Sequence, residues 1–96
     1  SSRELYDVVK EMMNENKLIE LREMLEEYHT MDLYDILLEL EDSDQVKLFE
    51  LLPLDTAASV LEESEAEFFI NIISRMDQEH IRSIFDWGIY QMYFVI

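Results

Sequence analysis

Carboxylates are the side chains most able to do chemistry in this sequence, which has 23 Asp and Glu residues among 96. Two pairs are adjacent along the chain, Glu26-Glu27 and Glu62-Glu63. A catalytic pair must share a proton, but neighbouring residues on a helix diverge by about 100° and do not face each other. The pattern therefore disfavours acid–base catalysis and favours the binding of divalent cations or of basic partners.

Other catalytic and metal-binding patterns are missing from the sequence. His29 and His80 are far apart, and neither has a second His or Cys at the spacing of a zinc site. No serine stands in a G-x-S-x-G elbow, and Gly88 is the only glycine, so there is no glycine-rich loop to hold a phosphate. We expect the protein not to be an enzyme.

The balance of charge indicates a folded, acidic surface. The formal net charge is −16, yet 49% of the residues are apolar, which is too many for a disordered acidic tail. Only seven Lys and Arg residues are present, so nucleic acid and anionic lipid are not expected partners. Like charges at this density repel one another, and cations or basic groups that neutralise them should stabilise a compact form.

The length of the chain suits one small domain, which we assign to residues 1–96. The absence of cysteine fits a reducing cytosol. The N-terminal stretch is a charged amphipathic pattern without the apolar core of a signal peptide. The longest apolar stretch, WGIYQMYFVI, has ten residues and is too short to span a bilayer, so we expect no direct membrane insertion.

Apolar residues recur at helical spacing along nearly the whole chain, and one Gly and one Pro leave few helix breakers. Leu21, Leu25 and Tyr28, for example, share one helical face. Pro53 disfavours a helical conformation at Leu52 and should end a helix there. Side chains of the capping type predict where later helices begin: Thr30, Ser43, Asp55, Ser64 (with Glu67 as a capping box) and Asp77.

A shift of 24 residues superimposes these helical patterns, aligning Ile36-Leu37 with Val60-Leu61 and Ile84-Phe85, and Leu48-Phe49 with Ile72-Ile73. The predicted fold class is all-α, an α-solenoid of short helix-turn-helix repeats with a period of about 24 residues. A plain helical bundle whose spacing mimics a repeat is the alternative. The predicted core residues include Leu37, Phe49, Leu61 and Ile72.

Three sequence motifs follow one another between residues 18 and 86. They are Leu21-Arg22 with Leu25-Glu26-Glu27; His29 with Asp32 and Leu33; and Leu51-Leu52-Pro53 with Ala57-Ala58 and Val60-Leu61. In this order and at these separations, the motifs resemble the cytosolic N-terminal domain of MgtE-type magnesium transporters.

The resemblance implies a right-handed superhelix of short helices, placed before a pair of CBS domains and a transmembrane pore. It also implies a cytoplasmic location at the inner face of the plasma membrane, as part of a membrane transporter. In such transporters the domain is part of an intracellular Mg²⁺ sensor, in which ions bound against the CBS domains neutralise facing acids and favour a closed pore. When Mg²⁺ falls, the acids repel and the domain swings away.

The resemblance further implies where metal ligands should stand. This chain has Ser59, Gln91 and Val95 where the family pattern has acids, and Glu62 and Glu63 lie one helical turn from Ser59. We therefore predict Glu62 and Glu63 as Mg²⁺ ligands. Binding should be weak and shared with a partner domain, because Mg²⁺ keeps several waters and takes only one or two carboxylates.

Residues 87–96 depart from the family pattern and are apolar. Such an end must be buried against the chain itself, against a second copy or against another segment. It either completes the last core layer or anchors an interface, for example of a homodimer. The anchoring side chains would be Trp87, Tyr90, Met92, Tyr93 and Phe94.

A second class of function stays open beside the Mg²⁺ sensor. Helical repeats related to those of the flagellar motor switch protein FliG stack for assembly rather than for ion sensing. A protein-interaction scaffold is therefore the alternative.

Overall fold

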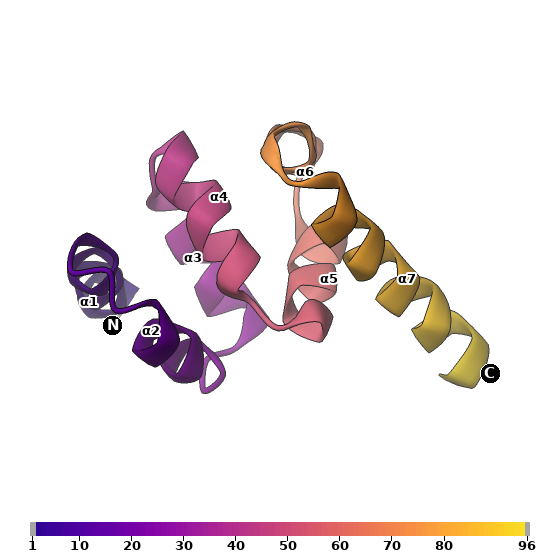
Figure 1. Ribbon diagram of the computed structural model, residues 1–96, viewed down its shortest axis with the longest axis horizontal. Coiled ribbons are helices and arrows are strands. Elements are labelled where there is room, and N and C mark those ends of the chain that lie inside the picture. The colour runs from indigo at the N-terminus through magenta and orange to yellow at the C-terminus, as the bar shows by residue number, and fades with distance from the viewer. Residues whose placement is uncertain (1, 96) are drawn as a thin grey trace.

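Seven helices make up the described part of the chain (Figure 1). The computed structural model describes the backbone of residues 2–95 and the side chains of residues 3–91, and no strand occurs among them. The helices are α1 (Ser2–Asn14), α2 (Leu18–Leu25), α3 (Thr30–Glu39), α4 (Asp42–Leu51), α5 (Leu54–Glu63), α6 (Ala66–Arg75) and α7 (Gln78–Val95). The prediction of an all-α fold is confirmed.

The helix boundaries repeat with the predicted period. Helices α2, α4 and α6 begin 24 residues apart, and so do α3, α5 and α7, so that from Leu18 onward a helix begins every 12 residues. Helices α3 to α6 have ten residues each. Two extended residues join each of them to the next: Leu40-Glu41, Leu52-Pro53 and Ser64-Glu65.

The turns form without glycine, and burial explains most of them. Leu52 is extended, with φ −69° and ψ 143°, because the ring of Pro53 disfavours the helical conformation before it. Leu40 and Met76 have no proline after them, but both side chains are buried in the core, which holds the chain where each helix ends. Ser64 ends α5 differently, since its hydroxyl donates to the carbonyl oxygen of Leu61 at 2.8 Å.

Helix α1 ends in a left-handed turn at Asn16, whose φ is +57°. The N–H of Lys17 donates to the carbonyl of Met12 and that of Asn16 to the carbonyl of Met13, the two bonds of a Schellman motif. Asparagine tolerates this backbone region better than most residues, so the sequence itself stops α1 here.

The helix starts predicted from capping residues were mostly wrong. Residues that start α3 to α6 directly follow His29, Glu41, Pro53 and Glu65, none of which makes a side-chain capping bond. Thr30, Ser43 and Asp55 lie inside the first turn instead, and Ser64 ends a helix rather than starting one, so the expected box with Glu67 does not form. The prediction for Asp77 was confirmed, because its carboxylate accepts from the N–H groups of Glu79 and His80.

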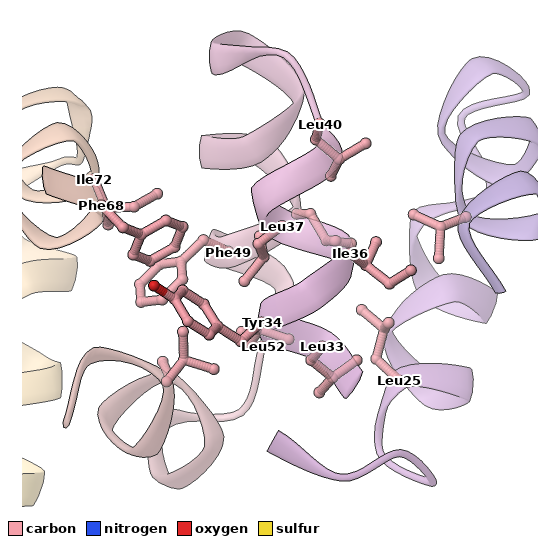
Figure 2. Close-up of a cluster of buried hydrophobic side chains, with 14 of the residues drawn as sticks. Leu25, Leu33, Tyr34, Ile36, Leu37, Leu40, Phe49, Leu52, Phe68 and Ile72 are labelled. Atoms are coloured by element: carbon pink, nitrogen blue, oxygen red, sulfur yellow. The ribbon is translucent and has the colours of Figure 1, made fainter. Parts of the chain in front are cut away.

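The core follows the same 12-residue rhythm. One residue in each of five successive helices is at most 2% exposed, and these residues are Ile36, Leu48, Val60, Ile72 and Ile84. Leu37, Phe49 and Leu61 are also buried, which confirms the predicted core. Figure 2 shows the centre of this cluster, where Tyr34, Phe49 and Phe68 from α3, α4 and α6 come together.

The helices follow one another along the longest dimension of the molecule, which measures 40 × 26 × 23 Å (Figure 1). Helix α1 packs on α3, α3 on α5, and α5 on α7, while α4 packs on α6. The last repeat departs from the pattern. Phe85 is 44% exposed, although its counterparts Leu37 and Leu61 in α3 and α5 are buried.

Candidate functional site

Glu62 and Glu63 are the last two residues of α5. Both side chains are exposed, and because the residues are adjacent they point to different sides of the helix. The carboxyl end of a helix carries a partial negative charge, which adds to the charge of the two glutamates. This end of α5 therefore favours a nearby cation.

Ser59 stands one turn before this pair and is half-buried. Gln91, the second position where the sequence resemblance implied an acid, is exposed on α7. Val95, the third, lies outside the residues whose side chains are described. Of these three positions, only Ser59 is on the same helix as the predicted ligands.

The surroundings of Glu62 are largely apolar. It lies at the edge of a groove of 240 Å³ between α5, α6 and α7, whose other lining residues include Ala58, Leu61, Phe69 and Phe85. Asp86 occupies the same position in α7 as Glu62 does in α5, 24 residues later, and is also exposed. The sequence comparison did not predict this groove.

Ion pairs lie elsewhere on the surface. The Arg75 guanidinium is 2.9 Å from Asp42, and the Lys10 ammonium is 2.9 Å from Asp44. The hydrogen bond to Asp44 and the charge of that carboxylate raise the pKa of Lys10 above its usual value. Among residues 3–91, no ion pair involves Glu62 or Glu63.

A second acidic concavity lies between α3, α4 and α6. It has a volume of 280 Å³, and Asp42, Glu65 and Glu67 line it together with Tyr34 and Phe68. All three acids are at or next to a helix N-terminus, where the helix dipole stabilises negative charge. The sequence carried a signal for it, because the 24-residue shift places Glu41 on Glu65 in the turns that begin α4 and α6.

No group of three or more His, Cys, Asp or Glu side chains within residues 3–91 is arranged to hold a metal ion. Glu62 and Glu63 accordingly stay a prediction as Mg²⁺ ligands. The two histidines lie in turns, as expected from the sequence. His29 directly precedes α3, and His80 is in the first turn of α7, with no hydrogen-bond partner for its half-buried Nε2 atom.

The comparison with protein families decides the kinship of the chain. The model of one family, described as the MgtE intracellular N domain, matches residues 28–87. The chain belongs to this family. No curated protein and no solved structure matches it. The MgtE N-domain match includes Ser59, Glu62 and Glu63 but not Gln91 or Val95.

The end of the family match coincides with a change in the helices. In this MgtE N domain, α3 to α6 each end after ten residues, whereas α7 continues for 18, through Gly88, where the 12-residue rhythm would place the next turn. Trp87 is half-buried and stacks on Tyr90, with ring centroids 6.0 Å apart, while Tyr90 itself is 51% exposed. The described part of the apolar end is therefore only partly covered.

The search for membrane spans gave a negative result for the described residues. None of their helices combines the length and the hydropathy that crossing a bilayer requires.

Proposed function

We propose that this chain is the regulatory cytosolic domain of a magnesium transporter. It senses intracellular Mg²⁺ through its acidic surface, which faces the CBS domains of the same full-length protein, and it gates the pore. The observation that supports this most is the match to the MgtE intracellular N domain over residues 28–87. The net charge of −16 supports it independently.

The proposed ion chemistry is weak binding between two surfaces. Mg²⁺ retains several waters and accepts one or two carboxylates from one protein surface, which suits the exposed pair Glu62 and Glu63. The negative end of α5 adds to the attraction. The remaining ligands come from the partner domain, so binding strengthens when the two surfaces meet.

The proposed gating follows from charge repulsion. With Mg²⁺ bound, the facing acids are neutralised, the domain stays against the CBS pair, and the pore is closed. Without Mg²⁺ the carboxylates repel across the interface, and the domain moves away. In this role the domain binds and transmits, and it catalyses no reaction.

The proposed architecture is a right-handed superhelix. The helix starts at 12-residue intervals and the packing of α1, α3, α5 and α7 in order support a regular stack. Such a stack holds its acidic residues on a rigid surface that moves as one body. The domain would lie at the inner face of the plasma membrane, without inserting into it and without binding nucleic acid.

An interaction scaffold related to the repeats of the motor switch protein FliG is the second candidate. The exposed apolar residues of α7 favour it, since Phe85, Ile89 and Tyr90 are 44%, 53% and 51% exposed. Large exposed apolar side chains that lie together mark interaction sites. A scaffold of this kind would bind its partner without Mg²⁺.

Association with the CBS region tests the proposal. The CBS-encoding segment of the same gene is expressed separately and titrated into residues 1–96 in a calorimeter, with Mg²⁺ and with a chelator. We expect binding that needs Mg²⁺ and weakens when Glu62 and Glu63 are replaced by Gln. A gene without CBS repeats, or equal binding with the chelator, would contradict the sensor role and favour the scaffold.

A further inference from the structure

The groove at the last repeat has an unusual exposure of apolar residues for this molecule. Its lining residues Phe69 and Phe85 have ring centroids 6.5 Å apart, and Phe85 is 44% exposed. Leu61, the counterpart of Phe85 one repeat earlier, is 6% exposed. The groove is thus a core position of the repeat that no helix covers completely in the described part of the chain.

The preceding repeat shows how the same position is normally filled. A shift of 24 residues places Ala58 on Tyr34 and Ile73 on Phe49. The Phe68 ring of α6 covers that earlier pair, with ring centroids 5.0 Å from Tyr34 and 6.5 Å from Phe49 (Figure 2). By the same rule, the last repeat calls for a large apolar side chain from a further short helix.

The length of α7 explains why this helix is missing from the described residues. The chain does not turn at Gly88 but continues in helical conformation to Val95. Gly88 lines the groove, and a Cβ atom added there would meet no heavy atom within 4 Å. The space beside α7 is therefore open to a helix from another polypeptide.

The charges around the groove select the kind of helix. Glu62 is at its edge, Glu63 and Asp86 are exposed on the same two helices, and Arg82 is the one Lys or Arg of α7. A second copy would bring another net charge of −16 against this one and would be repelled. A helix with Lys and Arg beside its apolar stripe has complementary charge instead.

We propose that the groove between α5, α6 and α7 is the docking site for one basic amphipathic helix of a partner protein. A Leu or aromatic side chain of that helix occupies the position that Phe68 fills one repeat earlier, and its Lys or Arg residues face Glu62 and Asp86. This inference does not depend on Mg²⁺ sensing, because it requires no metal ion.

The test uses residues 1–96 and fluorescent synthetic peptides of about 18 residues, long enough to cover the groove as a helix. One peptide has Leu and Phe on one helical face and Lys on the other. A second has the same composition in scrambled order, and a third has Glu in place of Lys. Fluorescence anisotropy is measured with a chelator at about 0.15 M salt, where long-range charge effects are screened. We expect the first peptide to bind at least about tenfold more tightly than either of the others.

Variants locate the binding. Gly88→Phe fills the groove from a position with open space, so the domain should stay folded while the affinity for the first peptide falls at least about tenfold. Glu62→Lys should weaken it as well. Ile19→Ser, which removes a side chain that is 74% exposed on the distant α2, is the matched control and should leave the affinity unchanged.

Two results would overturn the proposal. Equal affinity for the scrambled peptide, or an unchanged affinity in a folded Gly88→Phe variant, would mean that the peptide binds through overall charge alone. A dimer in analytical ultracentrifugation that Gly88→Phe abolishes would assign the groove to a second copy of the chain.

Discussion

The ring of Tyr34 stands edge-on to the ring of Phe68, with centroids 5.0 Å apart and an angle of 84° between the planes. The hydroxyl of Tyr34 also accepts a hydrogen bond of 3.1 Å from the backbone N–H of Glu65, which directly precedes α6. One residue of α3 therefore supports both the core face and the first turn of α6. This link joins two repeats that are 31 residues apart in sequence.

Tyr34→Phe tests the polar half of this link. The variant keeps the ring but leaves the N–H of Glu65 without its partner, and we expect the free energy of unfolding to fall by about 1–2 kcal/mol. Urea denaturation followed by circular dichroism measures it. Tyr28→Phe, on an exposed tyrosine, is the control and should change stability by less than about 0.5 kcal/mol.

Phe49→Ala tests the register of the repeat. Phe49 is fully buried, so removal of its ring should lower the free energy of unfolding by about 3–5 kcal/mol. Ile19→Ala, at an exposed position, should have an effect within about 0.5 kcal/mol. A loss below about 1 kcal/mol for Phe49→Ala would show that the register is wrong.

The ion pair of Lys10 and Asp44 predicts a pH dependence at alkaline pH. The hydrogen bond to Asp44, and then its charge, raise the pKa of Lys10 above 10.5, so the folded state favours the protonated amine. The stabilisation is complete below that pH and is lost as the pH rises through the raised pKa. We expect the difference in melting temperature between the wild type and Lys10→Met to shrink between about pH 9 and about pH 12. A difference that does not change with pH would contradict the pair.

Gly88→Ala should stabilise the domain. Gly88 is in the interior of α7, and an added Cβ has open space around it. Alanine is the better helix former by about 0.8–1.0 kcal/mol, so the melting temperature should rise by several degrees. A lower melting temperature would mean that α7 does not continue through residue 88 in solution.

The sequence predicted the helices and the repeat well, because both follow from local spacing of apolar residues. Pro53 also fixed one turn correctly. The predicted caps failed at Thr30 and Ser43, since buried residues such as Leu40 hold the turns in place, and burial depends on packing between helices. Capping preference is worth only about 1 kcal/mol and yields to such packing.

The candidate sites were less accessible from the sequence. The exposure of Glu62 and Glu63 at the end of α5 agrees with the expectation of surface acids. The apolar groove beside Glu62 was not predicted, because it arises from the continuation of α7 through Gly88 and from the contact of Phe69 with Phe85. Both are tertiary features that helical periodicity does not encode.

Thermal unfolding of residues 1–96 at increasing Mg²⁺ tests the proposed sensor role most directly. Binding at ten times the dissociation constant adds about 1.4 kcal/mol, so the melting temperature should rise by about 5–10 °C, saturating in the millimolar range. The rise should exceed those in Ca²⁺ and in NaCl of equal ionic strength. It should also be lost in the double variant Glu62→Gln/Glu63→Gln and kept in the matched control Glu26→Gln/Glu27→Gln, which changes another exposed, adjacent pair. An equal rise in NaCl, or in both double variants, would contradict specific Mg²⁺ binding at the end of α5.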